Sequence, residues 1–264
     1  MPSTSALIGY TGFVGGTLLR QARFDDRFRS TDIADIAGRR YDLLVCAGAP
    51  AEKWKANADP AADMASLQRL MDALARVHAE QVVLVSTVDV YPVPRGVDEG
   101  TPLDPAEGQP YGRHRLLLER FVAERFETLV VRLPGLYGHG LKKNIIFDLL
   151  NDNLVDRIDP AAVFQFYGLD RLWHDIETAR AARLGLVNFA TEPVAVADIA
   201  RHAFERVLAP KAGGPAASYD VRTRHAALFG GRGGYLQTRA EVLDGIAAYV
   251  REARARDGEL ARPS

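Results

Sequence analysis

The stretch ALIGYTGFVGGTLLR, residues 6–20, decides the fold of this chain. Its first three residues are apolar and strand-like, Gly9-x-x-Gly12-x-x-Gly15 follows them, and a helical pattern comes next. Glycines between a strand and a helix allow a tight turn and close backbone approach, and the N–H groups at the start of the helix then face an anion. The pattern therefore predicts a phosphate-binding turn, and the alternative is a turn that needs its glycines for packing alone. No Gly-Lys-Ser/Thr follows, which excludes a P-loop.

Short apolar runs alternate with amphipathic segments beyond this turn. Strands are expected at 41–48, 81–87 and 128–133, and helices at 61–78 and from Tyr111 onward. This rhythm predicts βαβ units and an α/β, doubly wound parallel-sheet Rossmann fold. We expect a dinucleotide-binding domain over residues 1–140, with a late strand near 184–190 returning to its sheet, and a smaller substrate-covering part over 141–264. Residues 17–41 leave room for one short strand, so one βα unit is expected to be missing.

Composition excludes several classes of protein. The 264 residues include 33 basic and 34 acidic side chains without basic blocks, which gives no electrostatic footprint for nucleic acid or a membrane surface. The single cysteine, Cys46, excludes an internal disulfide, and the six histidines show no metal-ligand spacing, so no metal site is expected. The sequence shows neither a secretory signal pattern nor a long apolar run, so we expect a cytoplasmic protein.

The residues that would contact the ribose of a dinucleotide lie near position 30. Asp32 would bind the 2′-hydroxyl of NAD, whereas Arg29 and Ser30 would bind the 2′-phosphate of NADP. The spacing leaves both cofactors open.

A second group of motifs carries the chemistry. Ser86-Thr87-Val88-Asp89 closes one strand, and Tyr111-Gly112-Arg113-His114-Arg115 opens a helix on which Tyr111 and Arg115 share a face. A glycine turn, a strand-end Ser/Thr and Tyr-x-x-x-base in this order resemble the short-chain dehydrogenase/reductase superfamily. The closer resemblance is to its extended branch, the NAD-dependent epimerase/dehydratase family. Residues 98–103, 132–138 and 187–194 also resemble segments of that family, so the resemblance runs through most of the chain.

The resemblance implies an NAD(P)-dependent oxidoreductase, epimerase or dehydratase acting on a nucleotide-linked or related sugar. It implies a homodimer formed through helix 61–78 and the helix that begins at Tyr111. Tyr111 matches the family's acid/base, Thr87 matches the residue that hydrogen-bonds the reacting oxygen, and Asp89 lies where dehydratases place an acid. The turn and the resemblance together give cofactor contacts at Gly9, Thr11, Gly12, Phe13, Val14, Gly15, Ala47, Gly48, Ser86, Pro134 and Gly135. Substrate contacts are expected from Lys142, Lys143, Asn144 and Arg222.

Arg115 departs from the family, which has lysine at this position. A phenol must lose about three pKa units, roughly 4 kcal/mol, to exchange protons near neutrality. One cation about 6 Å away supplies nearly 3 kcal/mol at an effective dielectric constant of about 20. Arginine can supply that charge, but it stays protonated and cannot pass a proton onward. Two readings therefore stay open: an enzyme that uses Arg115, and a non-catalytic NAD(P)-binding sensor or assembly protein that has lost turnover.

Overall fold

The computed structural model describes residues 4–211 and 214–260 and divides into two compact units. The first unit consists of Met1–Leu133 and Arg171–Asn188, and the second of Pro134–Asp170 and Phe189–Ser264. No helix in the described ranges has both the length and the apolar character needed to traverse a bilayer.

The first unit is built on one sheet of six strands, all paired in parallel, in the order β10-β6-β4-β3-β1-β2. Its strands are β1 (Ser5–Ile8), β2 (Asp26–Phe28), β3 (Arg40–Cys46), β4 (His78–Thr87), β6 (Glu127–Leu133) and β10 (Leu186–Asn188). The chain runs from β1 out to β2 and returns to β3 on the other side of β1. Such a reversal of strand order is where open α/β sheets bind their ligands, at the carboxyl ends of the strands.

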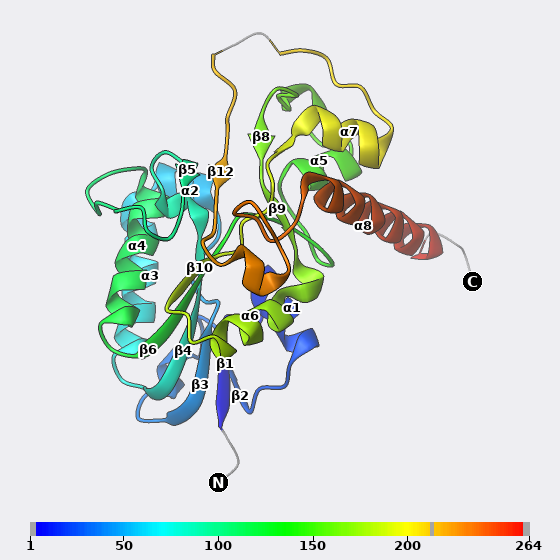
Figure 1. Cartoon of the computed structure of the whole chain (residues 1–264). Helices are drawn as coiled ribbons and strands as arrows, with labels where there is room; N and C mark the ends of the chain where they lie inside the picture. The colour runs from blue at the N-terminus through cyan, green and yellow to red at the C-terminus, as the bar shows by residue number, and fades with distance from the viewer. Residues whose placement is uncertain (1–3, 212–213, 261–264) are drawn as a thin grey trace. The chain divides into compact units, whose positions relative to one another are not determined.

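Helices cover both faces of this sheet, so the predicted doubly wound fold is confirmed (Figure 1). The helices and remaining short elements of the unit are α1 (Phe13–Gln21), η1 (Ile33–Ile36), α2 (Lys53–Ala58), α3 (Pro60–Leu74), η2 (Val88–Val90), β5 (Arg95–Val97), α4 (Pro110–Ala123) and α6 (Leu172–Ala181). The α3 and α4 helices lie on one face, and α1 packs with α6 on the other. Between α1 and β3 there is space only for the three-residue β2 and the single-turn η1, as the short 17–41 segment predicts.

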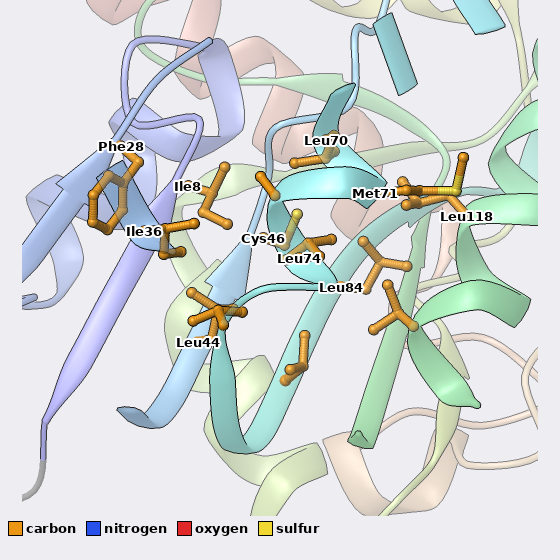
Figure 2. Close-up of a cluster of buried hydrophobic side chains, with 14 of the residues drawn as sticks. Ile8, Phe28, Ile36, Leu44, Cys46, Leu70, Met71, Leu74, Leu84 and Leu118 are labelled. Carbon is orange, nitrogen blue, oxygen red and sulfur yellow. The ribbon is translucent and has the colours of Figure 1, made fainter. Parts of the chain in front are cut away.

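The core of the first unit lies between the sheet and α3 (Figure 2). Alternate residues of the central strands, such as Leu44 and Cys46, point to this face and pack against Leu70 and Leu74 of α3. Burial raises the pKa of the Cys46 thiol to about 11, so this cysteine serves as a small apolar side chain.

The local sequence explains where the α3 and α4 helices begin, and these two N-termini position residues of the site. The α3 helix has Pro60 in its first turn, and the Asp59 carboxylate accepts the Ala62 amide at 3.0 Å. The α4 helix likewise opens with Pro110, which places Tyr111 in its first turn.

The second unit is made of short elements around its own core. They are β7 (Gly135–Tyr137), α5 (Ile145–Leu150), η3 (Val155–Arg157), β8 (Val163–Phe164), β9 (Phe166–Gly168), β11 (Val194–Ala195), α7 (Val196–Phe204), β12 (Asp220–Val221), η5 (Ala226–Phe229) and α8 (Arg239–Leu260); η4 (Leu169–Arg171) joins the two units. A parallel pair, β7 with β9, and an antiparallel pair, β8 with β11, stand beside the α7 and α8 helices. Buried residues such as Ile146, Ile199 and Ile246 form its core.

Candidate active site

The glycine turn joins β1 to α1, and two of its glycines are required by packing. Gly9 has φ +86°, and a Cβ there would lie 2.3 Å from the Ala47 carbonyl oxygen. A Cβ on Gly15 would lie 2.1 Å from the Gly9 carbonyl oxygen. The Gly9 amide donates to the Phe28 carbonyl at 2.7 Å, which draws the end of β2 to the same turn. Packing therefore explains Gly9 and Gly15 without any ligand.

Gly12 has a different environment. It is the N-cap residue of the nine-residue α1, no side chain caps this end, and the first turn carries no acidic residue. A Cβ at Gly12 would meet only the Gly9 carbonyl oxygen, at 3.3 Å. The N-terminus of α1, which is the positive end of its helix dipole, is thus uncapped and accessible, and Thr11, Phe13 and Val14 flank it. These residues fit a pyrophosphate group.

The neighbouring strand ends converge on this turn. The Ala47 amide donates to the Ile8 carbonyl at 2.9 Å, and a Cβ on Gly48 would lie 2.8 Å from Ile8 Cγ2. Ala47 and Gly48 therefore lie directly beside β1, as expected of residues at the floor of a dinucleotide site.

Arg29, Ser30 and Asp32 follow β2 and lie close to the turn. The Asp32 carboxylate accepts the Arg29 amide at 2.6 Å, and Arg29 Nε lies 3.5 Å from the same carboxylate. Ser30 is exposed, and 52% of the Arg29 side chain is exposed. Asp32 and Arg29 are thus paired with each other at the carboxyl end of β2, and the Arg29 side chain is the more exposed of the two.

Tyr111 and Thr87 meet at the end of β4. The Tyr111 side chain is buried, and the Thr87 hydroxyl lies near enough to the Tyr111 hydroxyl to lower the pKa of Tyr111. Thr87 also accepts the Asp89 amide at 3.1 Å. Gly112 permits this approach, because a Cβ there would lie 2.0 Å from the Asp89 carbonyl oxygen. The structure therefore brings Tyr111, Thr87 and Asp89 together.

The environment of Tyr111 favours its protonated form. Burial raises the pKa of Tyr111 most, and the negative charge of Asp89 also raises it. The charge of Arg115, the nearby Thr87 hydroxyl and, least of all, the charge of Lys53 lower the pKa of Tyr111, but the net pKa lies above the ordinary value. Tyr111 therefore holds its proton more strongly than a solvent-exposed tyrosine does.

Arg115 stacks on Tyr111 but is bound to another residue. Its guanidinium carbon lies 4.1 Å from the centroid of the Tyr111 ring. Nη1 and Nη2 both donate to the carboxylate of Asp63 in α3, with Nη2 2.9 Å from Oδ1, and they also donate to the carbonyl oxygens of Tyr111 and Pro50. The Asp63 and Arg115 side chains are 4% and 3% exposed. Arg115 is therefore a buried cation that is ion-paired with Asp63.

One polar atom of Arg115 is left over. Nε is buried and has no hydrogen-bond partner within residues 4–211 and 214–260. A buried N–H without a partner costs free energy unless a ligand satisfies it. Its position in the guanidinium that covers Tyr111 fits a hydroxyl group of a bound dinucleotide.

Ser86, predicted to contact the cofactor, belongs to a buried polar network. Its hydroxyl donates to Glu119 at 2.5 Å, and Glu119 accepts from Arg132 Nη2 at 2.6 Å. Arg132 Nη1 donates to the Tyr91 hydroxyl at 2.9 Å, and that hydroxyl contacts Asn188. The network ties α4 to β4, β6 and β10 beneath the site.

The other predicted contacts lie in the second unit. Pro134 and Gly135 lie at the start of β7, where a Cβ on Gly135 would meet the Gln165 carbonyl oxygen at 2.8 Å. Asn144 caps α5, accepting the Ile146 amide at 3.0 Å and donating to the Leu136 carbonyl at 2.8 Å. Arg222 pairs with Asp220 at 2.9 Å. Asn144 and Arg222 thus have local structural partners. Lys142 and Lys143 are exposed and lie on the loop before α5.

Sequence reasoning missed Asp63, Lys53 and Asn57. Asp63 precedes Leu67 and Leu70 by four and seven residues, so it lies on the apolar face of its helix, where a carboxylate needs a partner. The position of Asp63 on this apolar face could therefore have identified it from the sequence. Lys53 contacts Asp89, and Asn57 contacts Tyr111, only through the tertiary position of α2, which no local pattern encodes.

No cluster of three or more His, Cys, Asp and Glu in the described part of the chain is arranged to hold a metal ion.

Known proteins share this architecture. DesIV, a dTDP-glucose 4,6-dehydratase from Streptomyces venezuelae solved with NAD and TYD, is 18% identical, with a TM-score of 0.72 over 97% of this chain and 98% of its own. RMD from Pseudomonas aeruginosa, complexed with NADPH, is 16% identical, with a TM-score of 0.72 over 96% and 100%. The UDP-glucose-4-epimerase of Stenotrophomonas maltophila, solved with NAD and formylated UDP-arabinopyranose, is 13% identical, with a TM-score of 0.70 over 98% and 100%. At these identities the similarity shows a shared fold.

No curated protein sequence matches the chain significantly. The family model described as "NAD dependent epimerase/dehydratase family" matches residues 26–158, just over half of the 264 residues. The match contains β2 through β7, the tyrosine helix and the strand end that carries Thr87. The resemblance inferred from the motifs is confirmed, and the chain belongs to the NAD dependent epimerase/dehydratase family.

Proposed function

We propose that this protein is an NAD(P)-dependent enzyme that oxidises, reduces, epimerises or dehydrates a nucleotide-linked sugar. The observation that carries the proposal is the approach of Tyr111 to Thr87 at the carboxyl end of β4, in a doubly wound sheet whose first strand ends in a glycine turn. Family membership and the sugar nucleotides bound by proteins of the same fold support it.

The cofactor would lie along the carboxyl edge of the sheet. Its pyrophosphate would be held by the amides at the start of α1 near Gly12, and a hydroxyl group of the dinucleotide would accept from Arg115 Nε. When bound, the nicotinamide ring takes a hydride from a sugar carbon or returns one, and its oxidised form adds a positive charge.

Tyr111 and Thr87 would handle the oxygen of that sugar carbon. In the reductive direction Tyr111 gives its proton to the carbonyl oxygen as that oxygen becomes an alcohol, and Thr87 hydrogen-bonds the same oxygen. In the oxidative direction the proton of the alcohol would pass to the deprotonated Tyr111, a phenolate. For a dehydratase, Asp89 is the nearby carboxylate that would exchange a further proton.

A Tyr111→Phe variant tests this assignment. It removes the hydroxyl and keeps the ring beneath Arg115, so turnover of a sugar nucleotide should fall by about 10²–10⁴-fold while cofactor affinity changes little. Calorimetry gives the affinity, and exchange of deuterium between sugar and cofactor gives the hydride step. Tyr249→Phe, in α8 of the second unit, serves as the control. Unchanged turnover in Tyr111→Phe would remove Tyr111 from the mechanism.

The Arg115–Asp63 pair favours a second candidate, a non-catalytic protein that binds the dinucleotide and does not turn it over. Such a protein would bind NAD or NADP at micromolar concentration but exchange no deuterium with UDP-, dTDP- or GDP-linked sugars. The same two assays therefore separate the candidates.

A further inference from the structure

A row of polar side chains crosses the carboxyl ends of three neighbouring strands in the first unit. In the strand register Ser86 of β4 lies opposite Arg132 of β6, and Arg132 lies opposite Asn188 of β10. Side chains at paired positions of neighbouring strands lie on the same face of a sheet. Ser86 and Arg132 both donate to Glu119 of α4, so the row lies on the face that α4 covers (Figure 1).

Glu119 joins this row to α4. It lies eight residues after Tyr111 on the same face of the helix, and its side chain is 6% exposed. It accepts the Ser86 hydroxyl at 2.5 Å and Arg132 Nη2 at 2.6 Å, with Arg132 Nε 3.1 Å from its second oxygen. A buried ion pair of this kind is weak evidence for stability, and its best-attested role is to fix one register between packed elements.

The Glu119–Arg132 pair holds the chain on both sides of the η2 turn. Ser86, bound to Glu119, directly precedes Thr87 at the start of this turn. Tyr91 directly follows the turn, and its hydroxyl accepts Arg132 Nη1 at 2.9 Å. The Arg132 guanidinium carbon also lies 5.0 Å from the centroid of the Tyr91 ring. One ion pair therefore tethers the turn at its beginning and at its end.

The same turn packs against the first turn of α4. Thr87 Oγ1 accepts the Asp89 amide at 3.1 Å, which fixes the two residues relative to each other. The carbonyl oxygen of Asp89 lies so close to α4 that a Cβ on Gly112 would be 2.0 Å from it. Gly112 directly follows Tyr111. Any displacement of η2 along α4 therefore changes the position of Thr87 relative to Tyr111.

We propose that Glu119 is a positioning residue, which fixes the turn that carries Thr87 against the helix that carries Tyr111. It acts through Ser86 and Arg132 and touches neither the sugar nor the cofactor. This proposal rests on the proposed function and adds a residue outside the Tyr-x-x-x-base motif. It also gives the Ser86 hydroxyl a supporting role in place of the predicted cofactor contact.

The test removes one tether and keeps the ion pair. Ser86→Ala deletes the hydroxyl that binds Glu119, and two amides report on the turn: Asp89 donates to Thr87 Oγ1, and Tyr91 donates to the Val88 carbonyl at 3.1 Å. Native-state hydrogen exchange of these amides, followed by NMR, should become about 2–10-fold faster, which corresponds to the loss of one hydrogen bond. The amides of β3 should keep their rates.

Two further variants separate positioning from a general loss of stability. Ser86→Thr keeps the hydroxyl and should restore the wild-type exchange rates of η2. Thr128→Val is the matched control, because the Thr128 hydroxyl donates to the Phe126 carbonyl at 2.9 Å in the same sheet, away from Glu119. It should leave the exchange rates of η2 unchanged. Urea denaturation of each variant confirms that the fold is kept.

In an active enzyme, Ser86→Ala should lower kcat about tenfold or more and leave KM within about twofold, because displaced groups stabilise the transition state less well. Unchanged exchange at η2 in Ser86→Ala, equal acceleration at η2 and β3, or faster exchange with an unchanged kcat would each overturn the proposal. The exchange measurement uses cofactor-free protein, so it gives a result even if the wild type turns over no sugar nucleotide. That last outcome would reject the proposed function, while the exchange rates would still decide whether Glu119 holds the turn.

Discussion

Asp63 of α3 and Arg115 of α4 form a two-point ion pair in which Arg115 Nη2 lies 2.9 Å from Asp63 Oδ1 and both side chains are almost inaccessible to water. His114 Nδ1 lies 2.7 Å from the other carboxylate oxygen. One carboxylate therefore joins two neighbouring residues of α4 to α3. The basic residue of the Tyr-x-x-x-base motif has become a link between two helices, which explains how arginine is accommodated there.

Removing the carboxylate charge should destabilise the fold. Asp63→Asn leaves a buried guanidinium without its counter-charge, and breaking a buried pair in this way costs about 3–5 kcal/mol of unfolding free energy. Urea denaturation measures the change. Asp72→Asn on the same helix is the control, since Asp72 is exposed and contacts Gln68. A loss below about 1 kcal/mol in Asp63→Asn would show that the pair contributes little.

Acid should weaken the same link. Burial alone raises the pKa of Asp63, but the hydrogen bonds and charges of Arg115 and His114 outweigh it and hold the pKa below its usual value. Because the folded pKa is depressed, the contribution of Asp63 is complete above the unfolded pKa of about 4 and is lost as pH falls through the folded value. Denaturation curves from pH 6 to pH 3 should therefore fall less steeply for Asp63→Asn than for the wild type. Parallel curves would contradict this assignment.

Most of the fold could be predicted because it depends on local patterns. Strands such as Arg40–Cys46 and His78–Thr87 appear in the sequence as apolar runs. The short segment 17–41 likewise predicts the short β2. The two short sheets of the second unit could not be predicted, since two- and three-residue strands carry no detectable periodicity.

The contacts of the site could be predicted only where both contacting residues belong to the matched motifs. Tyr111 and Thr87 were identified through the family resemblance, and they lie close together in the structure. The electrostatic role expected of Arg115 did not allow for Asp63, which lies 52 residues earlier in the chain. Ser86 was identified as a strand-end hydroxyl, but its bond to Glu119 depends on a packed helix that spacing does not describe.

The two adjacent glycines of α1 should respond differently to alanine. A Cβ on Gly15 would lie 2.1 Å from the Gly9 carbonyl oxygen, so Gly15→Ala must shift the backbone of the turn, at a cost of about 1–3 kcal/mol, and should weaken cofactor binding. At Gly16 the nearest atom is the Tyr10 carbonyl oxygen at 3.5 Å, an ordinary contact. Gly16→Ala should therefore stabilise the helix by about 0.5–1 kcal/mol. Thermal denaturation with and without cofactor compares the two, and equal effects would contradict the close packing of the turn.

We propose that the residues after β2 favour NADP over NAD. The Asp32 carboxylate accepts the Arg29 amide at 2.6 Å, which occupies the group that would otherwise bind a ribose hydroxyl. The exposed Arg29 guanidinium at the end of β2 is a donor that suits a 2′-phosphate. We therefore expect the wild type to bind NADPH more tightly than NADH. Arg29→Ala should weaken NADPH binding about tenfold or more, the worth of a charge-assisted hydrogen bond, and leave NADH within about twofold.

Fluorescence titration of the two reduced cofactors measures this difference directly. Arg27→Ala removes an exposed arginine two residues earlier, in β2 itself, and should change neither affinity by more than about twofold, because screened surface charges contribute little. Tighter binding of NADH by the wild type, or an equal loss of both cofactors in Arg29→Ala, would assign the ribose contact to another residue. An Asp32→Ala variant then tests whether Asp32 makes the ribose contact. If the Asp32 carboxylate releases the Arg29 amide and binds the ribose, this variant should weaken NADH binding selectively.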